Sequence, residues 1–265
     1  MKTPESEENN VIDPLLAGTG TSLFLSPHLD DAVLSCGALI KALADRQKPI
    51  VATIFTETDR PPHTFAARTL LRQCAAGSGA ELFTTRRRED AAALGGIGAD
   101  LIHLGYPDAL FRRRTEPPSR LGRLVPEFGH LYPTYRFDIA RGRVSRADQP
   151  MIDRIISEVT EVVRTVGAER VFCPLAVGRH VDHVITRTVG EALPGTVIFY
   201  SDFPYNQAHA PESAFLARYD LRAAAWARGL AGKQRFIRDY GSQIACLFPG
   251  NRIPAAPEIY YSRAF

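Results

Sequence analysis

The segment Pro27-His28-Leu29-Asp30-Asp31 brings one imidazole and two adjacent carboxylates together. His28 and Asp31 are three residues apart, so on the first turn of a helix their side chains would face the same way. Asp30 lies between them and must point elsewhere. A metal site with a separate general base requires this arrangement, because two side chains can ligate the ion while the third moves a proton.

A second cluster, His180-Val181-Asp182-His183, lies far along the chain. If it meets the first cluster, His28, Asp31 and His183 supply two imidazoles and one carboxylate. Such a set of three protein ligands is typical of catalytic zinc, which keeps a fourth position for water. We therefore expect one Zn²⁺ per chain, or another divalent metal in its place, that activates water near neutral pH.

The two clusters follow segments that read as buried strands, at 22–26 and 170–175. Helical patterns begin directly after them, at 32–46 and 182–193. Ligand sites of open α/β sheets lie beyond the carboxyl ends of the strands, where two central strands are neighbours. The elements that carry the clusters could therefore bring them together.

The rest of the chain continues this alternation of strands and helices. It predicts an α/β fold of one domain, with a doubly wound, mostly parallel sheet and helices on both faces. Asp148 is the predicted cap of one of the helices. The further strands are predicted at 49–56, 100–105, 196–201 and 258–262, the last as an edge strand, and the further helices at 64–76, 86–97, 148–166 and 232–247.

Two segments depart from this pattern. Residues 1–21 are predicted to be a flexible lead-in to a domain that spans 22–265. Residues 106–147 lack a clear period and hold nine arginines against four acidic residues. This Arg-rich insertion is interpreted either as a lid over the substrate or as a solvated basic surface.

Composition excludes several classes of protein. The net charge of +3 is too small to argue for nucleic acid as a partner. Four cysteines lie far apart without a CxxC motif, which favours free thiols in a reducing compartment. The acidic N-terminus does not resemble a signal peptide, and no apolar stretch reaches the length of a membrane span. We expect a cytoplasmic protein and leave its oligomeric state open, including a homo-oligomer.

Each candidate residue also has a simpler interpretation. His28 could be a turn histidine and Asp31 a helix cap, while His180 and His183 could lie on a polar surface loop. Two such clusters at the ends of predicted strands favour a functional site.

The motifs match a known family. The segment 26–31 resembles the P-H-P-D-D signature of the PIG-L/LmbE-like deacetylases, with Leu29 at the second proline, and 180–183 resembles their second H-x-x-H motif. Supporting matches follow in the same order along residues 22–247. These are Arg86-Arg87-Arg88-Glu89 with Ile97-Gly98, Tyr106-Pro107-Asp108, and Lys233 with Ser242-Gln243.

This resemblance implies a Rossmann-like zinc hydrolase that removes N-acyl groups, mostly acetyl, from amino sugars such as N-acetylglucosamine or their conjugates. It implies that His28, Asp31 and His183 bind the zinc. Asp30 would be the general base that takes a proton from the attacking water. His180 would stabilise the tetrahedral oxyanion or pass a proton to the leaving amine.

The resemblance also implies that Arg86 and Asp108 contact the sugar. For Asp182 we expect a supporting catalytic role, in which it holds His180 in orientation. The Arg-rich insertion could recognise a phosphorylated or nucleotide-linked sugar, since arginine pairs with phosphate bidentately.

The sequence thus predicts a zinc-dependent N-deacetylase with a small amino-sugar-containing substrate. Two alternatives stay open. One is a zinc amidohydrolase for a non-sugar N-acyl substrate, and the other is a non-catalytic carbohydrate-binding protein on the same scaffold. The complete set of site residues argues against the second, because a binding module has no need of a separate base.

Overall fold

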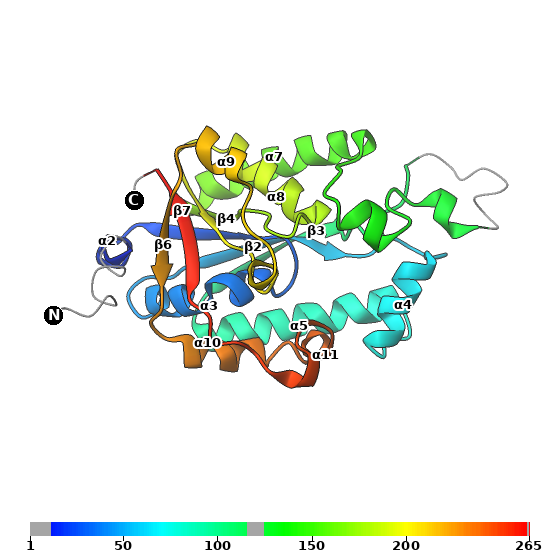
Figure 1. Cartoon of the computed structure of the whole chain (residues 1–265), viewed down its shortest axis with the longest axis horizontal. Coiled ribbons are helices and arrows are strands. Elements are labelled where there is room, and N and C mark those ends of the chain that lie inside the picture. The colour runs from blue at the N-terminus through cyan, green and yellow to red at the C-terminus, as the bar shows by residue number, and fades with distance from the viewer. Residues whose placement is uncertain (1–11, 116–124, 264) are drawn as a thin grey trace.

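A seven-stranded sheet runs through the protein, in the order β3-β2-β1-β4-β5-β7-β6. Figure 1 shows the computed structural model, which describes residues 12–115, 125–263 and 265. The first five strands in the chain pair in parallel, whereas β7 is antiparallel to both of its neighbours. The strands are β1 (Thr21–Ser26), β2 (Ile50–Glu57), β3 (Asp100–Pro107), β4 (Ala168–Pro174), β5 (Thr196–Tyr200), β6 (Arg222–Trp226) and β7 (Glu258–Ser262).

Helices cover both faces of this sheet, which confirms the predicted fold class. Figure 1 shows α7 and α8 on one face and α3, α5 and α10 on the other. None of the helices in the described ranges combines the length and the apolar character that crossing a membrane requires. The helices are α2 (Asp13–Ala17), α3 (Asp31–Ala44), α4 (Phe65–Gln73), α5 (Gly79–Ile97), α7 (Gln149–Val166), α8 (Val181–Ala192), α9 (Ser213–Arg218), α10 (Leu230–Ile237) and α11 (Gly241–Leu247).

Strand β1 lies at the centre of the parallel part and is buried on both sides. Leu23 and Leu25 belong to the core beneath α7 and α8, whereas Phe24 belongs to the core beneath α3 and α10. Because neither face meets solvent, the strand sequence is a continuous apolar run rather than an alternating one.

The chain reverses its direction of travel across the sheet between β3 and β4. From β1 it proceeds through β2 to β3 at one side, and then returns to place β4 against the other side of β1. The carboxyl ends of β1 and β4 therefore flank a topological switch point, where helices leave toward opposite faces. The two predicted metal-binding motifs follow these two strands.

The last quarter of the chain differs from the prediction. Strand β6 was not predicted, because alanine dominates its sequence Arg-Ala-Ala-Ala-Trp and has little strand propensity. It forms the edge of the sheet, so that β7 is not an edge strand as expected. The helix predicted at 232–247 is two helices, α10 and α11, which are separated at residues 238–240.

The two irregular segments are described in part. In the predicted lead-in 1–21, residues 1–11 lie outside the described residues, while Ile12 is buried and α2 follows it. In the insertion 106–147, residues 116–124 lie outside the described residues. The rest contains short helical turns at Pro126–Gly129 and Tyr135–Ile139.

Helix α8 approaches β4 closely at Gly190, which lets the helix pack against Cys173. A Cβ at this position would overlap Cys173 Sγ and lie 3.0 Å from Cys173 Cβ. We expect Gly190→Ala to lower the free energy of unfolding by roughly 1–3 kcal/mol, because the core is overpacked. Urea denaturation followed by circular dichroism would measure the change.

Gly95, in α5, provides the matched control. A Cβ there would have no neighbour within 4 Å among the described residues. Gly95→Ala should therefore raise the free energy of unfolding by up to about 1 kcal/mol, the difference in helix propensity. Equal effects of the two substitutions would contradict the close approach of α8 to β4.

Candidate metal centre and its cavity

The turn after β1 is held by side chains that fold back on its own backbone. Ser26 Oγ donates to the His28 carbonyl at 2.7 Å and accepts from the Ala32 N–H at 3.0 Å. Asp31 Oδ2 accepts the His28 N–H at 2.9 Å, at the first residue of α3. These bonds fix His28 and Asp31 next to each other before any other element contacts them.

His183 comes to the same point from the first turn of α8. Its Nε2 lies 3.2 Å from Asp31 Oδ2, and His28 Nδ1 lies 3.0 Å from the same oxygen. The structure therefore brings His28, Asp31 and His183 together, although 152 residues separate Asp31 from His183. All three side chains are at least nine-tenths buried.

The second nitrogen of each of these two imidazole rings is held by a carboxylate. His28 Nε2 lies 3.1 Å from Asp182 Oδ2, and His183 Nδ1 lies 2.7 Å from Asp202 Oδ1. Carboxylates in such positions orient ligating histidines and raise their basicity. The two carboxylates thereby orient the rings so that His28 Nδ1 and His183 Nε2 both face Asp31 Oδ2.

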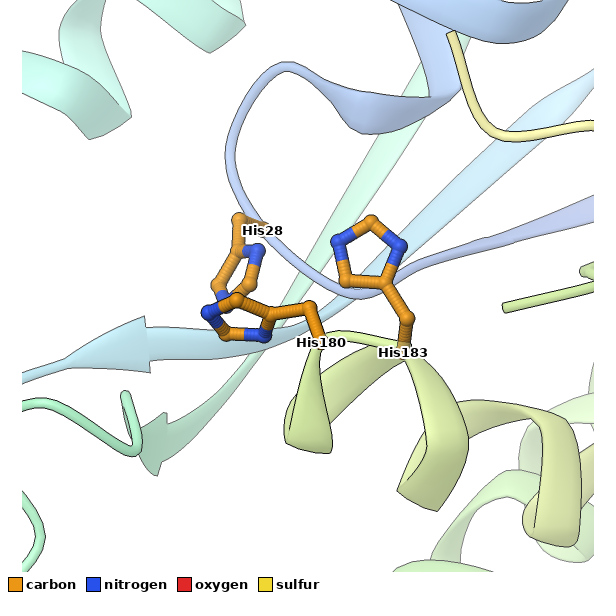
Figure 2. A group of neighbouring side chains, drawn as sticks. All are labelled: His28, His180 and His183. Carbon is orange, nitrogen blue, oxygen red and sulfur yellow. The ribbon is translucent and has the colours of Figure 1, made fainter. Parts of the chain in front are cut away.

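His180 completes a group of three histidines that Figure 2 shows converging from the β1 turn and the start of α8. Its ring centroid lies 5.0 Å from that of His28, with the two planes perpendicular. The three histidines can offer ring nitrogens that lie within 4.8 Å of one another, and His28, Asp108 and Asp182 form a second such group. The described residues therefore contain the donors for a metal ion in more than one combination.

Charge at this point also fits a cation. Burial opposes a charged imidazole, yet hydrogen bonds to Asp182 and Asp31 outweigh it and raise the pKa of His28 well above its usual value. His183 Nε2 is buried, and its nearest recorded contact among the described residues is the Asp31 carboxylate, with Oδ2 at 3.2 Å. A divalent metal would both use this lone pair and balance the carboxylates.

Asp30 lies beside the side chains that could bind a metal ion and is not one of them. Its pKa is raised to about 7, mainly because burial disfavours the charged form and secondly because of the Asp31 carboxylate. Arg86 opposes this shift, with Nη2 at 3.9 Å from Asp30 Oδ1. Arg86 also donates to Gln243 Oε1, and Gln243 in turn donates to the Leu29 carbonyl at 2.9 Å.

These side chains line one cavity of about 560 Å³. Asp108, which follows β3, lines it as predicted and places Oδ2 3.6 Å from His28 Nε2. Asp182 lies just outside, fully buried. The carboxylate, guanidinium and imidazole side chains among the described residues that line the cavity are His28, Asp30, Asp31, Arg86, Asp108 and His180.

The Asp182 carboxylate differs from its predicted role, because both of its oxygens are engaged away from the His180 ring. Oδ2 accepts from the Ala109 N–H at 2.8 Å and contacts His28, while Oδ1 pairs with Arg112. Asp182 contacts the His180 ring through its main-chain N–H, which donates to Nδ1 at 3.3 Å.

Arg112 is a residue of the centre that the sequence did not indicate. It is 2% exposed and bridges Asp182 to Asp148, whose Oδ2 lies 2.7 Å from Nη1. Tyr132 also donates to Asp148, at 2.6 Å. Asp148 was predicted as a helix cap, but its side chain makes no capping bond to α7 and pairs with Arg112 instead.

Asp202 was missed as well, although its position carries a signal. It follows β5 directly after Ser201, as Asp108 follows β3. Its Oδ2 accepts the Val177 N–H at 2.7 Å while Oδ1 meets His183. Because it follows a predicted central strand, Asp202 could have been added to the predicted site residues.

Comparison with models of known families identifies a match over most of the chain. The model of the family PIG-L, described as GlcNAc-PI de-N-acetylase, matches residues 23–193. That span contains both histidine motifs and every predicted site residue.

Two curated relatives are 2'-N-acetylparomamine deacetylases. The protein of Streptomyces fradiae is 31% identical over 194 residues, which are 70% of this chain and 58% of that protein. The protein of Niallia circulans is 26% identical over 206 residues, 71% of this chain and 68% of that protein. The chain thus matches little more than half of the length of the first relative.

Solved structures share the fold over almost the whole chain. A zinc-inhibited form of teicoplanin deacetylase has a TM-score of 0.73 at 20% identity and covers 91% of this chain and 97% of its own. The deacetylase of the A40926 pseudoaglycone has a TM-score of 0.67 at 21% identity, covering 92% and 97%.

The Arg112 bridge can be tested through stability. Arg112→Ala would leave Asp148 and Asp182 buried without their shared cation, and such a loss costs about 3–5 kcal/mol of the free energy of unfolding. Arg114→Ala, at an exposed arginine two residues away, should change it by less than about 0.5 kcal/mol. Equal urea midpoints for the two variants would contradict the bridge.

Proposed function

This chain belongs to the PIG-L family, and from that membership we propose that it is a zinc-dependent N-deacetylase for amino-sugar-containing small molecules or conjugates. The reaction is the hydrolysis of an amide, in which water and the N-acetyl group yield acetate and a primary amine. The observation that carries the proposal is the convergence of His28, Asp31 and His183 beside a cavity that His28, Asp30 and Asp31 line.

We assign the metal to His28, Asp31 and His183. Two histidines and a carboxylate are typical zinc ligands, and Asp182 and Asp202 supply the carboxylate partners that ligating histidines usually have. When bound, the ion supplies a Lewis acid, which amide hydrolysis needs because an amide carbonyl is a poor electrophile.

Asp30 is the general base in this proposal. It lies in the cavity next to Asp31, and its raised pKa makes the carboxylate basic enough to accept a proton from water near neutral pH. Arg86 keeps the charged form accessible by offering a positive charge nearby.

His180 is suited to donate a hydrogen bond to the developing oxyanion. Its Nδ1 accepts the Asp182 N–H, so a neutral ring carries its proton on Nε2. Burial and the His28 ring lower the pKa of His180, which favours this neutral form. Proton transfer from His180 to the leaving amine would require the imidazolium form, which the lowered pKa disfavours, so the hydrogen bond to the oxyanion is the role that we assign to it. The proton that Asp30 takes from the attacking water can pass to the leaving amine.

Arg86 and Asp108 are the proposed contacts to the sugar, because both line the cavity near these groups. The activity of the two relatives on 2'-N-acetylparomamine supports an N-acetylated amino sugar as the substrate. Tyr135, from the insertion 106–147, also lines the cavity, which supports a role of this segment in covering the substrate.

The proposal predicts release of primary amine from a panel of N-acetylated amino sugars, with and without phosphate groups. A chelator should abolish the release and added zinc should restore it, because the ligand set is complete within one chain. Colorimetric amine detection alongside metal analysis measures both quantities. A zinc-loaded protein that releases no amine from any member would contradict the proposed substrate class.

The base is tested by Asp30→Asn, which we expect to retain the metal and lose roughly 10²–10⁴-fold in kcat. His183→Ala is the matched variant and should lose the metal together with the activity. A metal-free Asp30→Asn protein, or one with full activity, would show that Asp30 has another role.

A further inference from the structure

Two cysteines that are far apart in the sequence come together at the wall of the cavity. Cys74 is the C-cap residue of α4 and Cys246 belongs to α11, and both line the cavity. The Cys74 thiol lies within hydrogen-bonding reach of Cys246, although 172 positions separate the two residues. Both are free thiols, and neither belongs to the site assigned above.

The two thiols of this pair differ in their exposure. Cys246 is exposed, so it is the sulfur that an oxidant in solution meets first. Cys74 is half-buried, and burial together with the neighbouring Cys246 raises the pKa of Cys74 to about 11. Cys74 therefore stays protonated near neutral pH and can donate its hydrogen to the Cys246 sulfur. In such an arrangement an accessible cysteine reacts and the neighbouring cysteine resolves the product.

The other two cysteines of the chain lack this arrangement. Cys36 and Cys173 are buried, and they belong to the separate cores on the two faces of the sheet. Burial raises the pKa of each of these thiols well above its usual value. Buried cysteines of this kind are inert. An oxidant should therefore act on the pair at the cavity and leave the core thiols unchanged.

The helices that carry the pair are attached to other parts of the site. In α11, Gln243 Oε1 accepts a hydrogen bond from Arg86. At the start of α4, the Phe65 N–H donates to Glu127 Oε1 of the insertion at 2.8 Å. A covalent bond between the two helices would therefore connect the insertion, through α4, to the helix that positions Arg86.

We propose that Cys74 and Cys246 form a reversible disulfide, with hydrogen peroxide or a related peroxide as the oxidant, and that this bond lowers turnover. The bond would fix α4 to α11, which form part of the same cavity wall. Entry of a substrate and release of a product depend on the motion of the segments that flank a site. The inference assigns a redox modification to the chain, which is separate from the hydrolysis itself.

The proposed reaction consumes one peroxide. The Cys246 sulfur attacks one peroxide oxygen, which breaks the O–O bond and yields a sulfenic acid and water. The Cys74 sulfur then attacks the sulfenic sulfur and displaces its hydroxyl group, which leaves as water with the proton of the Cys74 thiol. Two thiols and one peroxide thus yield one disulfide and two waters, and glutathione reverses the modification by thiol–disulfide exchange.

Mass spectrometry tests whether the bond forms. Treatment with a small excess of hydrogen peroxide should lower the intact mass by about 2 Da, since two hydrogens are lost, and peptide mapping should join Cys74 to Cys246. Cys36 and Cys173 are the internal control and should still react with maleimide once the protein is unfolded. A protein that keeps all four thiols, or that joins a different pair, would overturn the proposal.

Two variants distinguish the reacting cysteine from the resolving one. Cys74→Ser keeps the exposed thiol without its partner, so peroxide should oxidise Cys246 to the sulfinic acid, which adds about 32 Da and is not reversed by glutathione. Cys246→Ser removes the exposed thiol, so the same treatment should leave Cys74 reduced. Equally fast oxidation of Cys74 in the Cys246→Ser protein would overturn the proposed order of attack.

The consequence of the bond is measured by turnover and by hydrogen exchange. The oxidised protein should release amine at least about fivefold more slowly than the reduced protein, and glutathione should restore the rate. In Cys246→Ser the rates before and after peroxide should be equal. Amide hydrogen exchange in α4 should become slower on oxidation, because the disulfide restrains local opening of the helix.

The outcomes separate the disulfide from the proposed activity. A disulfide that changes neither the rate nor the exchange of α4 would overturn its regulatory role and leave the deacetylase intact. A disulfide that slows exchange in a zinc-loaded protein without any amine release would support the modification and count against the deacetylase.

Discussion

The site depends on a surplus of buried negative charge. Asp31, Asp108, Asp182 and Asp202 surround two histidines in a region from which solvent is nearly excluded. Isolated carboxylates are costly in such a place, so each must meet a cation or several hydrogen-bond donors. Many of the hydrogen bonds and ion pairs around the site provide these carboxylates with such partners.

Different parts of the chain meet the requirement in different ways. Backbone N–H groups serve Asp182 and Asp202, and Arg112 lies between Asp182 and Asp148 as a permanent cation. Among the described residues, Asp31 has only imidazole rings and the His28 N–H as partners. It is therefore the carboxylate for which a metal ion makes the largest difference, and the switch point of the sheet is what places it opposite His183.

The sequence predicted the elements that are governed by local pattern. The continuous apolar run of β1 and the spacing of His28 and Asp31 reflect burial and helix geometry, which neighbouring residues determine. Strand β6 was missed because its alanines form a strand only through pairing with β7. Arg112 was missed for a related reason, since an arginine in a loop gives no local sign of the partner it will meet, whereas the place of Asp202 after a strand was a sign that could have been used.

The Arg112 bridge limits how the insertion 106–147 can be replaced by a segment from another chain. Arg112 and Asp148 stand at the two ends of the insertion and hold each other across it, while Arg112 also holds Asp182. A chimera that imports a foreign insertion with only one of these two residues would bury an unmatched charge beside the site. If the exchange points lie outside 112–148, the imported segment brings its own pair of oppositely charged residues with it.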